Sequence, residues 1–132
     1  MPLFPKTERL HLKRQISDLF EKGEKWSCFP FRVILNFSTT DENASNAQVL
    51  VSVSKRNFKN ATDRNRLKRQ MREAYRLKKD PFLKSISSLS SENQNLLVHI
   101  GFIYTSKNKE PWALIERKIE KALVEVINKI SN

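Results

Sequence analysis

The stretch KRNFKNATDRNRLKRQMREAYRLKK, from Lys55 to Lys79, organises the interpretation of the whole chain. It contains eleven lysines and arginines but only two acidic residues, so it carries a net charge of +9 out of the chain's formal +11. In its second half, Leu67, Met71 and the pair Ala74-Tyr75 recur at intervals of three and four residues. This spacing predicts a helix with one apolar face that packs on a core.

The cations of this helix follow the helical repeat as well. At 100° per residue, Arg64, Lys68, Arg72 and Lys79 fall in one line beside the apolar face. Like charges at this spacing repel by about 0.2–0.5 kcal/mol per pair in an isolated helix, so a dense row indicates a polyanionic partner. A sequence pI near 10.0 also favours nucleic acid or an anionic surface. An ordinary solvated basic surface is the alternative, and the concentration of charge disfavours it.

Length and patterning predict one domain spanning residues 1–132, with residues 1–6 as a flexible arm and residues 80–95 as a polar connector. No apolar run approaches the roughly 20 residues that span a bilayer. The amino-terminal residues also lack the charged-then-apolar pattern of a signal segment. We therefore expect a cytoplasmic protein without a membrane partner.

The scarce residue types exclude several kinds of chemistry. The single cysteine, Cys28, cannot form an intramolecular disulfide. One cysteine and two histidines are also too few ligands for a structural zinc site. We expect Cys28 to be a small buried apolar residue. The two glycines, Gly23 and Gly101, cannot form a glycine-rich phosphate loop, which disfavours the common routes of nucleotide hydrolysis.

The amino-terminal half predicts a helix and two or three strands. A short amphipathic helix runs from about Thr7 and ends before Gly23. A strand alternates over Phe29–Phe37, a polar hairpin loop covers Ser38–Asn46, and a second strand spans Gln48–Ser54. A short strand over Trp26–Phe29 can precede them. The predicted inward-facing side chains of the first strand are Phe29, Phe31, Val33, Leu35 and Phe37.

The carboxy-terminal half predicts a strand and a helix after the basic helix. Asp80-Pro81 is expected to end the basic helix. Leu96–Tyr104 is almost continuously apolar, which is typical of a strand covered on both faces at the centre of a sheet. Pro111 suits the first position of a last helix, whose apolar residues keep a three-and-four spacing. The order of elements predicts an α+β sandwich with helices on a mixed sheet.

The polar residues offer binding rather than bond-making chemistry. Arginine and lysine in a row bind phosphates, and Asn65 can reach a sugar hydroxyl or a base edge. For Asp63 and Glu73 we expect ion pairs with neighbouring arginines rather than general acid or base roles. His99 lies in an apolar strand and is expected to be a core histidine.

The block RNRLKRQMREAYR, from Arg64 to Arg76, resembles the signature of the protein subunit of bacterial ribonuclease P. VSVSKR, Val51–Arg56, matches the strand that leads into that signature, and the resemblance extends from about Arg9 to Ile127. It implies a single-domain α-β sandwich in the order αβββαβα, with three helices, a mixed four-stranded sheet and a left-handed β-α-β crossover. It also implies that catalysis belongs to an RNA subunit, whose bound Mg²⁺ activates the water that removes the 5′ leader of precursor tRNA.

The resemblance further implies two binding surfaces and no catalytic or metal-binding residue in the protein. The partners are ribonuclease P RNA, expected in a 1:1 complex, and precursor tRNA, with no DNA partner. The residues expected to bind the catalytic RNA are Lys55, Arg56, Arg64, Asn65, Arg66, Arg69 and Arg76. Those expected to bind the leader, in a cleft between the first helix and the open sheet face, are Ile16, Phe20, Arg32, Ile34, Ser52, Lys68 and Arg72.

Two other functions are compatible with the composition. A structural RNA-binding protein of the ribosome could be equally basic, but the block centred on Arg64-Asn65-Arg66 argues against it. A DNA-binding regulator is disfavoured because no helix-turn-helix pair or dimer seam is evident.

Overall fold

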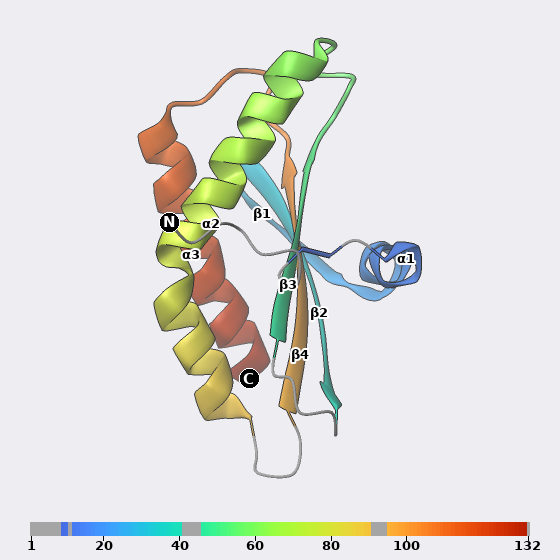
Figure 1. Cartoon of the computed structure of the whole chain (residues 1–132), viewed down its shortest axis with the longest axis vertical. Coiled ribbons are helices and arrows are strands. Elements are labelled where there is room, and N and C mark those ends of the chain that lie inside the picture. Colours follow the sequence, from blue (N-terminus) through green and yellow to red (C-terminus); the bar gives the residue numbers. More distant parts are fainter. Residues whose placement is uncertain (1–8, 11, 41–45, 91–94, 132) are drawn as a thin grey trace.

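The computed structural model of the chain describes residues 9–10, 12–40, 46–90 and 95–131. Two helices cover one face of a sheet and a shorter helix lies against the other (Figure 1). The predicted α+β class and the predicted order of helices and strands are confirmed. The elements are α1 (Lys13–Lys22), β1 (Glu24–Cys28), β2 (Phe31–Thr40), β3 (Asn46–Val53), α2 (Ala61–Leu89), β4 (Asn95–Tyr104) and α3 (Trp112–Ser131).

The strands form one mixed sheet in the order β1-β2-β4-β3. β4 pairs antiparallel with β2 and parallel with β3, so it is central, as its apolar run predicted. The predicted hairpin across Ser38–Asn46 is wrong because β4 lies between the two strands that it was expected to join. β2 also extends to Thr40 and β3 begins at Asn46. Alternation of side chains shows which residues form a strand but not which strand lies beside it.

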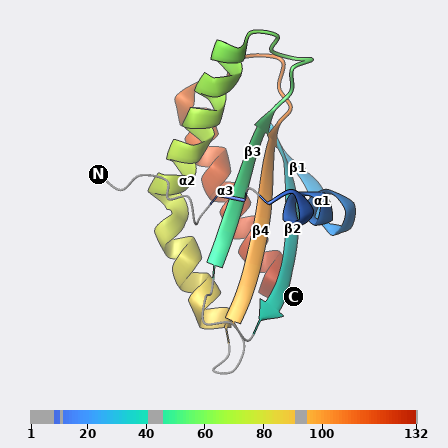
Figure 2. The same ribbon diagram turned by 45° about the vertical axis from the view of Figure 1, so that its right-hand side comes forward.

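The connection from β3 through α2 to β4 joins two neighbouring parallel strands. Figure 2 looks onto the sheet from the face opposite α2, and there β3 and β4 both run upward with β4 to the right of β3. The crossover is therefore left-handed, as the family resemblance implied. Such connections are right-handed in about 98% of cases, so local geometry alone would have favoured the opposite hand.

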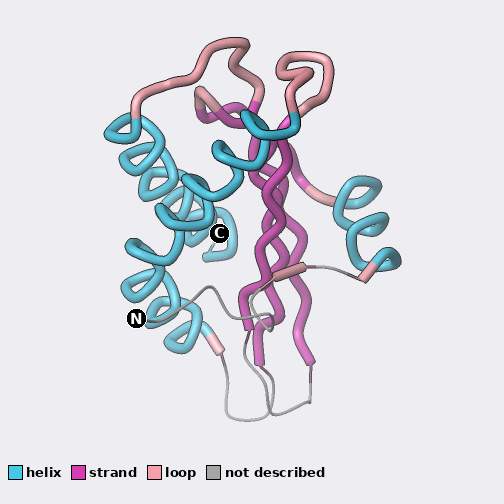
Figure 3. Tube along the Cα trace, turned by 45° about the horizontal axis from the view of Figure 1, so that its top comes forward, coloured by secondary structure: helices cyan, strands magenta, loops and turns pink. Residues whose placement is uncertain are grey.

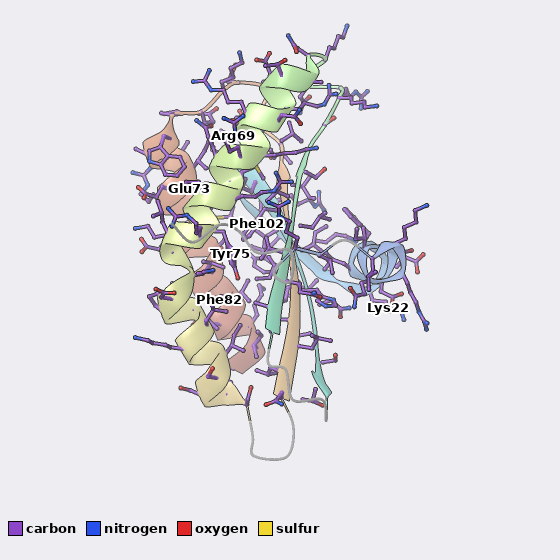
Figure 4. All side chains as sticks on the ribbon, viewed as in Figure 1. Lys22, Arg69, Glu73, Tyr75, Phe82 and Phe102 are labelled. Atoms are coloured by element: carbon purple, nitrogen blue, oxygen red, sulfur yellow. The ribbon has the colours of Figure 1, made fainter. Side chains whose placement is uncertain are left out.

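The main core lies between the sheet and the pair α2 and α3. Tyr75, Phe82 and Phe102 project into this layer (Figure 4), and none of them is more than 4% exposed. α3 contributes its predicted apolar face, with Ile115 and Ile119 fully buried. Cys28 is buried in the same core, as expected, and its burial raises the pKa of its thiol.

α2 continues through Pro81 to Leu89, so the predicted helix end at Asp80-Pro81 and a connector over residues 80–95 are wrong. A proline inside a helix costs about 3 kcal/mol through a lost hydrogen bond and a steric clash. Phe82 and Ile86, which are 4% and 2% exposed, lie beyond it. Burying two such side chains contributes about 1.5–3 kcal/mol each, which offsets the cost of Pro81. Residues 91–94 lie outside the described part.

α1 begins at Lys13 rather than near Thr7, and Arg9 and Leu10 before it pair with the sheet instead. The amide of Leu10 donates to the carbonyl of Val49 at 3.0 Å, and Arg9 forms a parallel bridge with Val49. The predicted flexible arm at residues 1–6 lies outside the described residues. Arg9 and Leu10 therefore lie along the outer edge of β3.

Both glycines of the chain lie where α1 meets the sheet. A Cβ at Gly23 would lie 2.4 Å from the carbonyl oxygen of Leu19 and 2.6 Å from a methyl of Ile34, closer than atoms can approach. A Cβ at Gly101 would lie 3.3 Å from Leu19. Glycine thus permits a close approach, and Leu10, Leu19 and Ile34 form a second, smaller core beneath α1.

The ends of the predicted strand Phe29–Phe37 differ from its centre. Phe31, Val33 and Leu35 are buried as expected. Phe29 lies in a turn with a cis bond to Pro30, and Phe29 and Phe37 are 56% and 43% exposed.

Among the helices of the described residues, none is long and apolar enough to cross a membrane.

Candidate nucleic-acid interface

The turn between β3 and α2 is tied to the start of the basic helix. Asn60 caps the helix by accepting a hydrogen bond from the amide of Thr62 at 2.9 Å. The guanidinium of Arg64 donates to the carbonyls of Phe58 and Lys59 at 2.7 and 2.9 Å. Arg64 therefore holds the turn in place, a structural role that its position in the basic block did not indicate.

One flank of α2 carries the row of Arg64, Lys68 and Arg72 toward the β3 edge. Arg72 is half-buried, and burial, followed by the nearby charge of Arg9, lowers the pKa of its guanidinium. Arg9 therefore adds a positive charge to this side of α2. Arg9 was not expected at this site, because only the bridge to β3 brings it near α2.

The other flank of α2 points away from the sheet, where Figure 4 shows Arg69 and Glu73. Arg76 donates through Nε to Glu73 at 3.0 Å, and this hydrogen bond lowers the pKa of the carboxyl and raises that of Arg76. The expected ion pair of Glu73 is thus confirmed. Asp63 pairs instead with Lys109 at 3.0 Å, and not with a neighbouring arginine as expected.

The open sheet face presents a polar row beside α1. Arg32 of β2, Ile103 of β4 and Ser52 of β3 are in register across three strands. Arg32 is exposed and Ser52 is partly exposed, so the structure brings these two predicted leader-binding residues to one surface.

The α1 residues predicted to bind the leader differ in their exposure. Phe20 is 40% exposed, whereas Ile16 packs against the small core. Ile34, on β2 beneath α1, is only 1% exposed. In this arrangement Ile34 supports the surface from below rather than lining it.

The loops after β3 and β4 meet at one end of the sheet (Figure 3). The side-chain amide Nδ2 of Asn57 donates to the carbonyl of Thr105 at 3.4 Å and joins the two loops. Between them lies a hollow of about 620 Å³ lined by Arg56 and Lys107 among others. Of the predicted RNA-binding residues, Lys55 and Arg56 are therefore at this end. Lys107 lies beside them, and it was not predicted from the sequence because it is outside the basic block.

His99 is buried on the open-face side of β4, in register with Asn36 and Gln48. Burial lowers the pKa of its imidazole, so the neutral form is favoured. Its Nε2 has no hydrogen-bond partner among the described residues, so it is a core histidine that is not fully satisfied. Within the same residues, no group of three or more histidine, cysteine, aspartate or glutamate side chains could hold a metal ion.

Comparisons with known proteins agree on one family. The model of the family described as ribonuclease P matches residues 4–126. A ribonuclease P protein component of Porphyromonas gingivalis is 32% identical over 125 residues, which cover 95% of this chain and 87% of that protein. The corresponding protein of Petrotoga mobilis is 34% identical over 117 residues, covering 89% of this chain and 95% of that one.

Solved structures show the same fold. The RNase P protein of Staphylococcus aureus superposes with a TM-score of 0.58 at 20% identity, covering 96% of this chain and 97% of that one. The RNase P protein of Thermotoga maritima gives a TM-score of 0.59 at 18% identity, with coverage of 89% and 96%. Because the matches in sequence extend over nearly the whole chain, it belongs to the family of ribonuclease P protein components.

Proposed function

We propose that this chain binds the catalytic RNA of ribonuclease P and the 5′ leader of precursor tRNA, and so promotes removal of the leader in tRNA maturation. The observation that carries the proposal is the position of α2, whose two cationic flanks face different surroundings. One flank lies beside the β3 edge and Arg9, and the other faces solvent away from the sheet.

The solvent-facing flank and the helix start form the surface for the catalytic RNA. Asn65, Arg66 and Arg69 are exposed there, and Lys55 and Arg56 extend the surface across the preceding turn. Arginine holds phosphate with a fork of donors, which suits a folded RNA with closely spaced phosphates. Arg64 and Arg76 contribute less freely, because each already donates to atoms of the protein.

The flank beside the β3 edge and the open sheet face form the surface for the leader. Lys68 and Arg72 supply cations, and Arg32 and Ser52 supply polar groups along the sheet. Phe20 offers an exposed ring on which a base can stack. Proteins usually bind single-stranded RNA with cations along the RNA backbone and with aromatic side chains on which the bases stack.

The chemical step belongs to the RNA in this proposal. Mg²⁺ held by the catalytic RNA would activate the attacking water, as the membership of the chain in the family of ribonuclease P protein components implies. One protein serves one RNA, and the complex works in the cytoplasm on precursor tRNA.

Reconstitution with a cognate ribonuclease P RNA tests the proposal. At low Mg²⁺, the protein is expected to raise the rate of leader cleavage, because its cations screen the phosphates of RNA and leader that Mg²⁺ otherwise screens. The measurement is single-turnover cleavage of precursor tRNA with and without protein. Unchanged cleavage at every Mg²⁺ concentration, with the protein shown to be folded, would refute the function.

Replacing Phe20 with alanine is expected to weaken binding of leader-bearing substrate by the RNA-protein complex about 5- to 150-fold, from the 1–3 kcal/mol of a base-aromatic stack. Affinity for mature tRNA should stay unchanged. Phe37→Ala is the matched control, since Phe37 is 43% exposed against 40% for Phe20 and lies on the opposite sheet face. Equal weakening of both tRNA ligands would assign Phe20 to folding instead.

A further inference from the structure

Two adjacent hollows lie where α2 passes the start of α3, and Trp112 lines both. One, of about 310 Å³, is also lined by Arg66, Gln70 and Lys109. The other, of about 280 Å³, is lined by Arg69, Gln70 and Glu73. Both are on the solvent-facing flank of α2, so an aromatic ring stands beside the two arginines expected to bind the catalytic RNA.

Trp112 is held firmly although part of it remains exposed. It packs against the main core as the first residue of α3. Pro111 precedes it, and the carbonyl of Pro111 accepts from the amides of Leu114 and Ile115 at 3.0 and 3.2 Å. An aromatic ring whose backbone is already ordered loses little conformational entropy on binding, which favours its use as a stacking platform.

The charges around Trp112 divide into neutralised and unpaired groups. Asp63 pairs with Lys109, and Glu73 pairs with Arg76. Arg66 and Arg69 are both exposed, and neither has an ion-pair or hydrogen-bond partner among the residues that the structure describes. Glu110, which lines the first hollow, accepts a hydrogen bond from the hydroxyl of Ser106 at 2.7 Å. The second hollow, where the carboxylate of Glu73 is paired, therefore suits a nucleobase, and the two exposed arginines suit the phosphates next to it.

We propose that Trp112 stacks on an unpaired nucleobase of the catalytic RNA, with Arg66 and Arg69 on the flanking phosphates. The side-chain amide of Gln70, which lines both hollows, is within the site to meet the base edge. A base that leaves its own helix gains about 1–3 kcal/mol from such a stack. The inference rests on the proposed function, because it requires that α2 bind this RNA.

Trp26, the other tryptophan of the chain, provides the contrast. Its indole Nε1 donates to Glu125 at 3.0 Å, and Nζ of Lys129 lies 4.7 Å from the centre of its ring. The protein itself thus occupies the polar edge and one face of Trp26. This leaves Trp112 as the tryptophan suited to an external base, and makes Trp26 a matched control.

The test is the affinity of three variants for refolded ribonuclease P RNA. Trp112→Leu keeps an apolar side chain but loses the ring, and is expected to weaken binding about 5- to 150-fold. Trp112→Phe should retain most of the affinity, and Trp26→Leu should match the wild type. The slope of log affinity against log salt should stay unchanged in Trp112→Leu, because no cation is removed.

Fluorescence gives a second, independent readout. In a Trp26→Phe variant, the RNA should quench the remaining Trp112, whereas in a Trp112→Phe variant it should leave Trp26 largely unquenched. Wild-type affinity of a folded Trp112→Leu protein would overturn the stacking site and leave the proposed function standing. If the wild-type protein itself failed to bind the RNA, the proposed function would fail first.

Discussion

Replacing Phe82 with alanine is expected to lower the free energy of unfolding by about 3–5 kcal/mol. Phe82 is 4% exposed, and its ring meets that of Tyr75 edge to face with 6.4 Å between centroids. Alanine would remove this contact and leave a cavity in a core that packs closely. Urea unfolding followed by circular dichroism measures the change.

The stability of Phe82→Ala shows whether the segment of α2 beyond Pro81 is packed on the core. Phe37→Ala is the control. Phe37 is 43% exposed, so its replacement should lower the free energy of unfolding far less. If Phe82→Ala cost no more than Phe37→Ala, the helix beyond Pro81 would not be packed on the core. That result would favour the helix end at Asp80-Pro81 that the sequence predicted.

Replacing Arg64 with alanine is expected to weaken both RNA binding and the folded protein, whereas replacing Arg66 should weaken RNA binding alone. Arg66→Ala should bind the catalytic RNA about 10- to 150-fold more weakly, from the roughly 1.5–3 kcal/mol of a hydrogen bond to a charged group. Arg64→Ala should weaken binding less, because its guanidinium already donates to two carbonyls of the turn. Each should also reduce the salt slope of binding by about 1. Only Arg64→Ala should in addition lower the free energy of unfolding, by about 1–2 kcal/mol, because two carbonyls lose their donor.

The measurements are RNA binding over a range of salt concentrations and urea unfolding of the free protein. Arg117→Ala, which removes an exposed arginine of α3, should change neither slope nor stability. Unchanged stability of Arg64→Ala would show that its hydrogen bonds to the turn contribute nothing. Unchanged RNA affinity of both Arg64→Ala and Arg66→Ala would remove the start of α2 from the RNA interface.

Much of the fold could be predicted because burial follows short-range periodicity. Leu67, Met71 and Ala74 recur with the helical period and are buried on α2. The apolar run of β4 predicted a central strand, which the pairing confirms. The hairpin and the helix end at Pro81 failed for one reason: β4 and the buried Phe82 act through contacts with residues distant in the chain, and local preferences do not include them.

The candidate site was likewise predicted only in part from the sequence. The basic block identified the cations of α2 that meet RNA in the proposal. It did not reveal that Arg64 is engaged by the preceding turn, that Arg9 lies beside Arg72, or that Trp112 stands next to Arg66. Each of these depends on segments that meet only after the sheet has formed.

The sequence by itself determined where the charge is concentrated, that a helix with one apolar face runs through Leu67–Tyr75, and that Leu96–Tyr104 is a buried strand. Those properties depend on neighbours within one or two helical turns, so they can be read along the chain. The tertiary structure alone decided that β4 lies between β2 and β3 and that the crossover is left-handed. That arrangement, which contacts between distant residues select, places one flank of α2 beside the surface proposed for the leader and the other beside Trp112.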